Sequence, residues 1–565
     1  MPRVVALIVT DLERTRLGLP SRVAECVAGR SVLEHTVARV AQVAAVRAIV
    51  LVHPVAQDPV TLLGKIGVGK PLAGHADPGN LTDMHQSMRR AARKWSLSAW
   101  RGGLAGAGCY DELLPAAPLV DAMQRYKAES ALLVGADWPM VDPDLCQRVL
   151  DQHLANPEAM AFTFSQAPPG LAGIAVSASL LQQIAVKHGL FGQMLSYNPR
   201  MPQADPIGRD VCVQIDAAVR SCDCRFIYDT DRSVSMINAI ADRLGNRFAS
   251  ADAGVVADAT HRVAADRPGG FGRLPQQITI ELTPQRPVAG PITPHQYVRF
   301  DREPMALDTA LHIVAQLGVD GDTAVTLGGL GDALLHDDWL VVVEAAHRAG
   351  VLGLAVTTDL LVDQPTLAKL LAAPLDVVSV RLNADTAHVY ESVMGDDRFK
   401  QVTDNLQWLL AERANREQAG ATGGGENHGV RPTVGMPWIV PHLVKTDQTM
   451  VDMETFFDRW LYFAGQAVIE PATTGCGLMP VQSPVRMAPP KRRSCRQIDR
   501  RLTILSDGRV AQCDQDWLGR NCPGDAAVTP LAEIWQTMNA LRRSHRDGQW
   551  AELALCGGCD QWHRP

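Results

Sequence analysis

Four cysteines near the end of the chain have a spacing that indicates a shared metal site. Cys495 precedes an apolar run at Leu502–Leu505, and Cys513 follows the turn Ser506–Gly508 and a second short apolar run. Two cysteines therefore flank one predicted hairpin. The chain then ends in a Cys-Gly-Gly-Cys sequence at 556–559, whose glycines let the backbone curl so that both thiols face one centre.

Four thiolates around one centre suit two kinds of metal site. Tetrahedral zinc and a cubane [4Fe-4S] cluster both accept four cysteine ligands, so the spacing alone does not separate them. The chain has 12 cysteines in 565 residues, and those outside this group show no regular spacing. A disulfide scaffold is therefore not expected, and the composition favours the reducing cytoplasm.

The C-terminal pattern resembles the SPASM module, an auxiliary iron-sulfur domain found at the C-terminus of many radical S-adenosylmethionine (SAM) enzymes. The four cysteines, Asp507-Gly508 and Glu533-Ile534-Trp535 carry the resemblance. It implies one [4Fe-4S] cluster with the ligands Cys495, Cys513, Cys556 and Cys559. Cys522, beside the hairpin, could substitute as a ligand. Replacing Cys559 by Ala is expected to remove the cluster, since binding energy at a metal site is also folding energy.

The length and composition predict a globular protein of about three domains. The net charge of -7 gives no electrostatic reason to expect nucleic acid or an anionic membrane as a partner. The apolar run Val4–Val9 is followed by Asp11 without a small-residue cleavage site, so we interpret it as a buried strand and not as a signal peptide. No apolar span approaches the roughly 20 residues that a membrane helix needs.

The first part of the chain has the alternating pattern of a parallel α/β sheet. Apolar strands are expected at Val4–Val9, Ala48–Val52 and Ser130–Val134, and a helix at Ser31–Val43. Ligands of such sheets bind beyond the carboxyl ends of the strands. Asp137 follows the third strand, where a carboxylate can hold Mg²⁺ beside a nucleotide. The alternative is that Asp137 caps the next turn.

Three stretches of this domain resemble the cytidylyltransferase-like family of the nucleotide-sugar transferase fold, which activates acidic or modified sugars. They are Arg16–Val23 with Ala28–His35, Gly135–Pro143, and Arg225–Asp231. The resemblance implies phosphate contacts at Arg16 and Arg22, and Mg²⁺ at Asp137 and Asp229. The stretch 11–14 departs from the family, because it places acidic groups where phosphate should approach.

Strand and helix patterns also alternate through the middle of the chain, which predicts a partial or full α/β barrel. The strands are expected at Gln277–Leu282, Ala324–Leu327, Gly353–Val356 and Val377–Leu382. Their order resembles the core of radical SAM enzymes. Gly328, Gly329 and Asp332 occupy the place of that family's Gly-Gly-Glu strand end, and we expect them to form a vestigial SAM pocket.

The loop after the first of these strands departs from the radical SAM family. That family has Cys-x-x-x-Cys-x-x-Cys there, and its three thiolates leave the fourth iron of a cluster open for SAM. Residues 283–292 contain no cysteine, and none occurs between Cys224 and Cys476. We therefore expect a catalytically silent core that does not use SAM. The alternative is that Cys476 and other distant cysteines assemble a site on folding.

Two stretches show little periodicity. Residues 249–272 are rich in Ala, Asp and Gly, and residues 413–429 are rich in Gly, Ala and Glu. We expect a linker at the first stretch and a flexible surface insertion at the second.

Together these patterns predict an α/β protein in four parts. The parts are a doubly wound cytidylyltransferase-like sheet (1–245), a linker (246–275), a degenerate radical-SAM-like barrel (276–490) and a SPASM domain (491–565). This combination resembles spiro-SPASM-type proteins. It implies an iron-sulfur protein of sugar or glycan metabolism with a nucleotide, a nucleotide sugar or a protein as partner. The alternatives are an active Mg²⁺-dependent CMP-sugar cytidylyltransferase and an active radical SAM enzyme.

Overall fold

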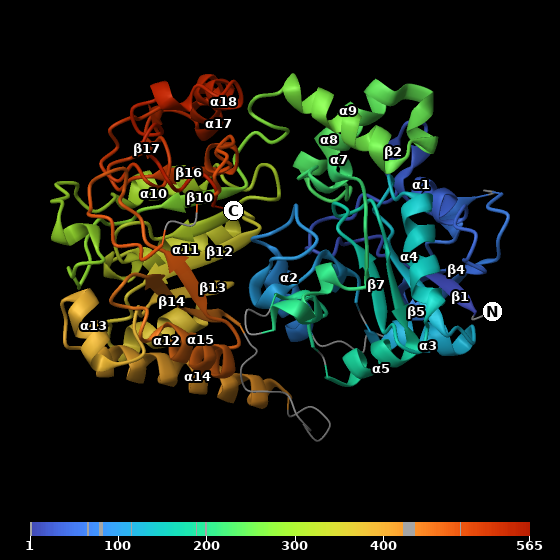
Figure 1. The fold of residues 1–565 in the computed structure, drawn as a ribbon, viewed down its shortest axis with the longest axis horizontal. Coiled ribbons are helices and arrows are strands. Elements are labelled where there is room, and N and C mark those ends of the chain that lie inside the picture. The colour runs from blue at the N-terminus through green and yellow to red at the C-terminus, as the bar shows by residue number, and fades with distance from the viewer. Residues whose placement is uncertain are drawn as a thin grey trace. The chain divides into compact units, whose positions relative to one another are not determined.

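The chain folds into two compact units, Met1–Arg267 and Pro268–Pro565, each built on its own sheet (Figure 1). The computed structural model describes residues 3–64, 67–77, 83–114, 116–187, 189–197, 201–421, 436–485 and 488–564. None of the helices in this described part combines the length and the apolar character needed to cross a membrane.

The first unit contains a seven-stranded sheet in the order β5-β4-β1-β6-β8-β7-β9. Strands β5, β4, β1 and β6 are parallel, and β8 is antiparallel to both β6 and β7. Every residue of β1 and β6 is buried, so both faces of the sheet centre are covered. The predicted α/β class is confirmed. The strands are β1 (Val4–Val9), β4 (Ala48–Pro54), β5 (Leu72–Asp77), β6 (Ser130–Gly135), β7 (Phe162–Ser165), β8 (Ile174–Ser177) and β9 (Cys212–Val213).

Helix α1 (Val32–Val40) shows how local sequence sets the helix starts of this unit. Ser31 Oγ accepts the Glu34 N–H at 3.1 Å, and the Glu34 carboxylate accepts the Ser31 N–H at 2.6 Å. This reciprocal cap satisfies donors that a helix start leaves free. The other helices are α2 (Asp83–Arg93), α3 (Ala116–Arg125), α4 (Pro143–Ala155), α5 (Ala178–Lys187), α6 (Gly192–Leu195), α7 (Ala217–Arg220) and α8 (Asp231–Leu244), and a small hairpin joins β2 (Cys26–Val27) to β3 (Arg30–Ser31).

The stretch expected to be a linker contains a helix, α9 (Ala253–Ala265). Asp252 caps it by accepting the Val255 N–H at 2.8 Å. Its buried face, which includes Val256 and Val263, packs against α7 and α8. The prediction of an irregular linker over 249–272 is therefore wrong for this part, because small alanines supply the buried face and leave little contrast in the pattern. The division between the two units falls after Arg267.

The second unit contains a nine-stranded sheet in the order β15-β14-β13-β12-β11-β10-β16-β17-β18. Strands β10 to β15 are parallel and adjacent in chain order, as successive βα units of a partial barrel require. These six strands are β10 (Gln277–Ile280), β11 (Ala324–Leu327), β12 (Gly353–Thr358), β13 (Val377–Arg381), β14 (Trp438–Lys445) and β15 (Val468–Pro471). The helices among them are α10 (Leu307–Val314), α11 (Trp339–Arg348), α12 (Gln364–Ala372), α13 (Ala387–Met394), α14 (Phe399–Ala421) and α15 (Met453–Ala464).

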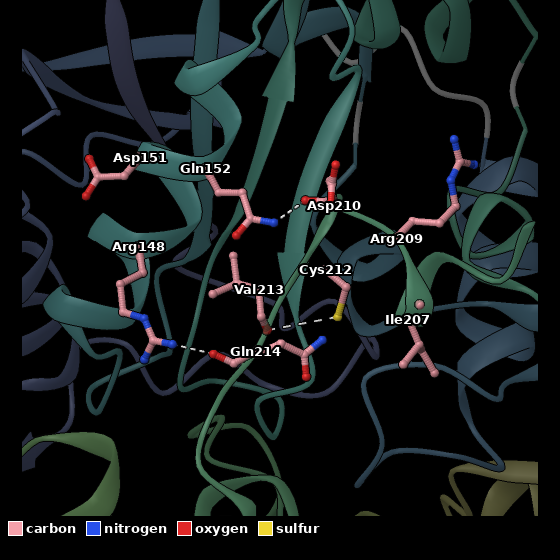
Figure 2. A pocket seen from close by; sticks show the side chains of 10 residues that line it. Arg148, Asp151, Gln152, Ile207, Arg209, Asp210, Cys212, Val213 and Gln214 are labelled. Atoms are coloured by element: carbon pink, nitrogen blue, oxygen red, sulfur yellow. Dashed lines mark hydrogen bonds between the residues drawn. The ribbon is translucent and has the colours of Figure 1, made fainter.

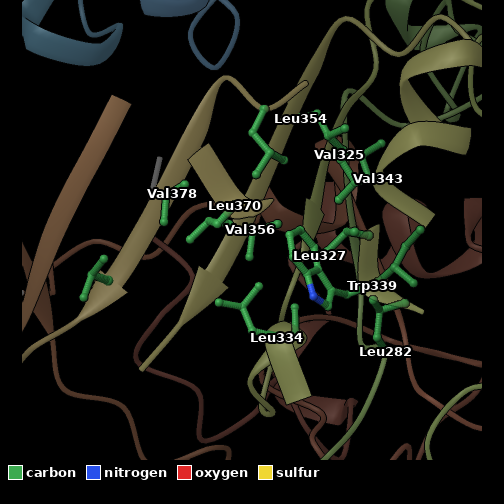
Figure 3. Close-up of a cluster of buried hydrophobic side chains, with 14 of the residues drawn as sticks. Leu282, Val325, Leu327, Leu334, Trp339, Val343, Leu354, Val356, Leu370 and Val378 are labelled. Carbon is green, nitrogen blue, oxygen red and sulfur yellow. The ribbon is translucent and has the colours of Figure 1, made fainter. Parts of the chain in front are cut away.

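The core of this unit lies between the parallel strands and their helices (Figure 3). Leu327 and Val356 come from neighbouring strands, and they share one buried cluster with Trp339 of α11 and Leu370 of α12. Burying side chains of this size contributes about 1.5–3 kcal/mol each. The packed sheet therefore fixes the positions from which the loops at its carboxyl edge begin.

The C-terminal segment joins this same sheet. Strand β16 pairs in parallel with β10, with Gln277 opposite Arg501 and Ile280 opposite Ile504. The expected boundary between residues 490 and 491 therefore does not separate two sheets. The remaining elements are α16 (Gln497–Arg500), β16 (Arg501–Ile504), β17 (Arg509–Ala511), β18 (Gly524–Asp525), α17 (Leu531–Thr537) and α18 (Asn539–Arg546).

Helix α14 extends into the stretch expected to be a flexible insertion. It continues through Arg413 to Ala421, and the buried Arg413 donates a hydrogen bond to the Pro437 carbonyl at 3.2 Å. The prediction is wrong for this first part, since Glu, Gln and Ala are also good helix formers. Residues 422–429 lie outside the described residues.

Candidate metal centre and nucleotide pocket

Five cysteines line one cavity in the second unit. Cys495 precedes α16, Cys513 follows β17, and Cys556 and Cys559 belong to the final turns. Cys476 reaches the same cavity from the loop after β15. The structure thus brings together the four cysteines predicted as ligands and adds a fifth that their spacing did not reveal.

The sulfurs of two predicted ligands, Cys556 and Cys559, accept hydrogen bonds from nitrogen. Such N–H donors stabilise thiolates and shift the potential of a cluster that the thiolates hold. The cavity therefore suits thiolate ligands. The donors are Gln512 Nε2 to Cys556 Sγ at 3.2 Å and the Gln561 N–H to Cys559 Sγ at 3.3 Å. Near the other two ligands, backbone N–H groups oppose the effect of burial on the pKa of Cys495 and Cys513.

The thiols of this cavity differ in acidity. Burial raises the pKa of Cys495 to about 11 and holds that of Cys513 well above its usual range. A hydrogen bond from the Cys476 thiol lowers the pKa of Cys559 to about 7, against the effect of burial. Because the thiolate is the form that binds metal, filling the site would release protons.

Helix α18 fixes the backbone around Cys495. The Arg542 guanidinium lies 3.5 Å from the centre of the Trp535 ring, and its Nε donates to the Ile498 carbonyl at 2.9 Å. His545 Nδ1 accepts the Cys495 N–H at 3.4 Å. Burial lowers the pKa of His545 to about 4, so the imidazole is neutral and can accept this hydrogen bond.

Cys522, considered above as a substitute ligand, is absent from the cavity lining. Its exposed thiol donates instead to the Gly519 carbonyl at 3.1 Å. Although the five cysteines line one cavity, no group of three or more Cys, His, Asp or Glu side chains in the part of the chain that the structure describes is already arranged to hold a metal ion, so their thiolates would have to turn toward a bound cluster.

The loop after β10 carries an ion pair where the radical SAM family has thiolates. Arg286 Nε donates to Asp359 Oδ2 at 3.0 Å, and Arg381 Nε lies 3.2 Å from Asp359 Oδ1. The Asp359 side chain is fully buried. Burial opposes its ionisation, but Arg286 and Arg381 outweigh burial and lower its pKa. A buried charge network of Asp359 with Arg286 and Arg381 therefore lies at the carboxyl ends of these strands.

Asp332 of the expected vestigial pocket has its hydrogen bonds satisfied within the chain. Its carboxylate accepts the Thr358 hydroxyl at 2.9 Å and the N–H groups of Asp359 at 2.8 Å and Leu334 at 3.0 Å. Gly328 and Gly329 lie at the same strand end, where a Cβ on Gly328 would come within 2.8 Å of Thr357.

Asp137 and Asp229 form an acidic pair beyond the carboxyl end of β6. The Tyr228 N–H donates to the Asp137 carbonyl at 2.8 Å, which brings the two segments together. Burial and then the Asp229 charge raise the pKa of Asp137 to about 7. Arg225 Nη2 lies 2.6 Å from Asp229 Oδ2 and 2.8 Å from Glu112. A cation beside Asp137 would relieve the repulsion between the two aspartates.

The two arginines expected at phosphate have acidic neighbours in the structure. Arg22 pairs with Asp231 and lies 3.7 Å from Glu25. Burial lowers the pKa of Arg16, while the charges of Asp11 and Asp137 oppose this shift. A phosphate at Arg22 would have to compete with the carboxylate of Asp231.

A surface hollow of about 640 Å³ lies beside β9 in the first unit (Figure 2). Arg148 donates to the Gln214 carbonyl, and Gln152 donates to the Asp210 carbonyl. These hydrogen bonds tie α4 to the segment around the edge strand β9. The lining of this hollow includes none of the residues predicted as site residues.

Several solved structures are similar to parts of this chain. SuiB of Streptococcus suis bound to S-adenosylmethionine is 11% identical, with 58% of this chain and 84% of SuiB covered and a TM-score of 0.39. BtrN in complex with AdoMet and 2-DOIA is 13% identical, with 51% and 93% covered and a TM-score of 0.34. A cytidylyltransferase from Leptospira borgpetersenii is 13% identical, with 48% and 97% covered and a TM-score of 0.31.

Parts of the chain are also similar to a curated protein and to a family model. An uncharacterized protein of Treponema pallidum is 28% identical over 129 residues, which are 23% of this chain and 35% of that protein. Residues 495–560 match the SPASM family model, described as an iron-sulfur cluster-binding domain, which confirms the SPASM module predicted from the cysteine pattern.

Proposed function

We propose that this chain is an iron-sulfur protein that holds one [4Fe-4S] cluster beside a barrel that does not cleave SAM, and that its first unit binds a nucleotide with Mg²⁺. The cavity lined by cysteines carries the proposal, because it gathers all four predicted ligands and nitrogen donors bond to the sulfurs of Cys556 and Cys559. A bound cluster would supply one-electron transfer. Its ligands would be Cys495, Cys513, Cys556 and Cys559.

The SPASM match favours a [4Fe-4S] cluster over zinc at this site. The buried surroundings agree, since burial and hydrogen bonds to the ligand sulfurs are ways in which a protein sets the potential of a cluster. Arg492 supports the same turns by donating to the Cys556 carbonyl at 2.7 Å. Its positive charge lies beside a site that four thiolates would make negative.

The proposal of a silent barrel rests on the loop after β10. Arg286 of that loop pairs with the buried Asp359, and Asp332 accepts three donors from the chain. SAM would have to break both arrangements in order to bind as it does in the radical SAM family. The residues at the barrel mouth therefore support a binding or structural role for the second unit.

The acidic pair supports a second candidate function, an active CMP-sugar cytidylyltransferase. In that reaction an oxygen of an acidic sugar attacks the α-phosphate of CTP, the bond to the β-phosphate breaks, and pyrophosphate leaves. Asp137 and Asp229 would hold Mg²⁺, which offsets charge that develops on the phosphates. Arg16 would face the phosphates, while Arg22 would first have to leave Asp231. We place either function in sugar or glycan metabolism.

An anaerobic analysis of the purified full chain tests the main proposal. The measurements are iron, zinc and acid-labile sulfide per chain together with the visible spectrum. We expect about four irons and four sulfides and the broad absorbance of a [4Fe-4S] cluster. Stoichiometric zinc without that absorbance would overturn the assignment.

A further inference from the structure

Cys476 lies outside the matched SPASM segment, yet it lines the same cavity as the four predicted ligands. Cys476 and Cys559 enter this lining from segments more than 80 residues apart in the sequence. A fifth thiol in a cavity built for four thiolates is in position to replace one of them as a ligand.

The backbone around Cys476 adopts an unusual conformation. Gly475, Cys476 and Gly477 have φ values of 56°, 54° and 89°, and left-handed backbone is unfavourable for cysteine by about 1–2 kcal/mol. The turn is closed by hydrogen bonds from the Leu478 and Met479 N–H groups to one carbonyl, at 2.8 and 2.9 Å. Residues held in such a conformation cluster at functional sites, where the surrounding structure enforces them.

Contacts on both sides tie this loop to the cysteine cavity. A Cβ on Gly475 would lie 2.2 Å from the Trp517 ring, so only glycine allows this approach. Thr473 Oγ1 donates to Gln515, which also lines the cavity. Gln561 Nε2 donates to the Ala472 carbonyl at 3.4 Å. The loop is therefore fixed against the segments that follow Cys513 and Cys559.

We propose that Cys476 and Cys559 compete for one iron of the C-terminal cluster, so that the site has five usable thiolates. This inference rests on the proposed function. Either Cys476 or Cys559 would supply the fourth thiolate to a bound cluster, and the cysteine that is not bound would carry the proton as a thiol. The number of sulfur ligands and the oxidation state of the cluster would therefore be the same in both arrangements. The competition would couple the last βα loop of the barrel to the cluster.

Ligand variants test the proposal by their iron content. Cys559→Ala was expected from the sequence to remove the cluster, but with Cys476 present we expect it to keep at least about half of its iron after anaerobic reconstitution. Cys476→Ala should do the same. The double variant Cys476→Ala/Cys559→Ala should fall to about a tenth or less. The matched control Cys559→Ala/Cys522→Ala should behave like Cys559→Ala, because the Cys522 thiol lies outside the cavity lining.

Alkylation of the loaded wild-type protein tests the same point without relying on the folding of a variant. Anaerobic treatment with iodoacetamide, followed by mass spectrometry, should modify a fraction of Cys476 and a fraction of Cys559, while the other three thiols stay protected. Complete modification of Cys476 with full protection of Cys559 would overturn the competition between these two cysteines and would leave the proposed cluster standing. Wild-type protein that takes up no iron overturns the proposed function and this inference with it.

Discussion

Cys513 connects the hairpin to the cysteine cavity and has no neighbouring thiol assigned to replace it. We expect Cys513→Ala to lose the cluster and to melt several degrees below the loaded wild-type protein, because metal binding contributes to folding. Iron analysis and a thermal melt under argon measure both effects. The control is Cys522→Ala, whose exposed thiol lies away from the cavity. Equal iron in Cys513→Ala and wild type would contradict the ligand assignment.

Asp137 should make nucleotide binding depend on pH. Its pKa is raised to about 7, first by burial and then by Asp229, so below neutral pH it is protonated and Mg²⁺ must displace the proton. The melting shift given by CTP with Mg²⁺ should therefore grow between pH 6 and pH 8. Saturation at a hundredfold excess over Kd stabilises a fold by about 2.7 kcal/mol.

Asp137→Asn should remove both the shift and its pH dependence. The matched control is Asp151→Asn, an exposed aspartate that lines the separate hollow beside β9. A shift of equal size in wild type and Asp137→Asn would mean that Asp137 only caps the turn.

Individual residues were predictable where the chemistry depends on local spacing. The four ligand cysteines follow from a hairpin and a Cys-x-x-Cys, whereas Cys476 stands alone in the sequence. From the sequence it enters only the alternative that distant cysteines assemble a site on folding, and its flanking glycines, in Thr-Thr-Gly-Cys-Gly, are the local signal beside it. The partner of Arg22 could not be predicted in this way, since Asp231 is 209 residues away and no local pattern reveals the pair.

At the scale of elements, the loop after β10 and the end of β12 depend on one buried carboxylate. Asp359→Asn would leave Arg286 and Arg381 without their counter-charge. Breaking a buried pair in this way costs about 3–5 kcal/mol. Urea unfolding measures the loss. Asp363→Asn is the matched control, because this exposed residue caps α12 and asparagine is an equally good cap, so little change is expected.

The same loop predicts the outcome of an activity assay. Residues 283–292 offer no thiolate for a second cluster, so the loaded protein should form no 5′-deoxyadenosine from SAM after reduction with dithionite. Chromatography of the quenched mixture measures the product. As a control, the visible absorbance of the protein should fall when dithionite is added, because this shows that the C-terminal cluster accepts electrons. Product above the level of a protein-free mixture would restore the radical enzyme alternative.

The strands and helices expected from the sequence are present in both sheets, but helices α9 and α14 extend into stretches expected to be irregular, and one strand pairing was not expected. Helix α9 buries mostly alanine and valine, which gives a weak contrast between its two faces. Strand β16 was expected as part of a local hairpin, and its hairpin with β17 exists. Its parallel pairing with β10 was not predictable, because no turn residue or spacing specifies which distant edge strand a hairpin will join.

For the whole molecule, the division into two units predicts how fragments behave. The fragments 1–267 and 268–565 should each fold and melt cooperatively, since each contains its own sheet and core. The fragment 268–490 should not fold, because Leu502, Ile504 and Trp535 belong to the same buried cluster as the barrel. Thermal melts followed by circular dichroism, together with amide-proton NMR spectra of each fragment, distinguish folded fragments from unfolded ones. A cooperative melt of 268–490 would show that the C-terminal segment is an independent domain.

The pairing of β10 with β16 has a consequence for synthesis on the ribosome. Gln277 lies opposite Arg501, a partner 224 residues later in the chain. One edge of β10 must therefore stay open while the whole of the barrel emerges, and open strand edges are templates for aggregation. The Cys495 and Cys513 segments that flank the closing hairpin are made at the same late stage. The supply of iron and sulfide during translation is then expected to set how much of the newly made chain becomes folded protein.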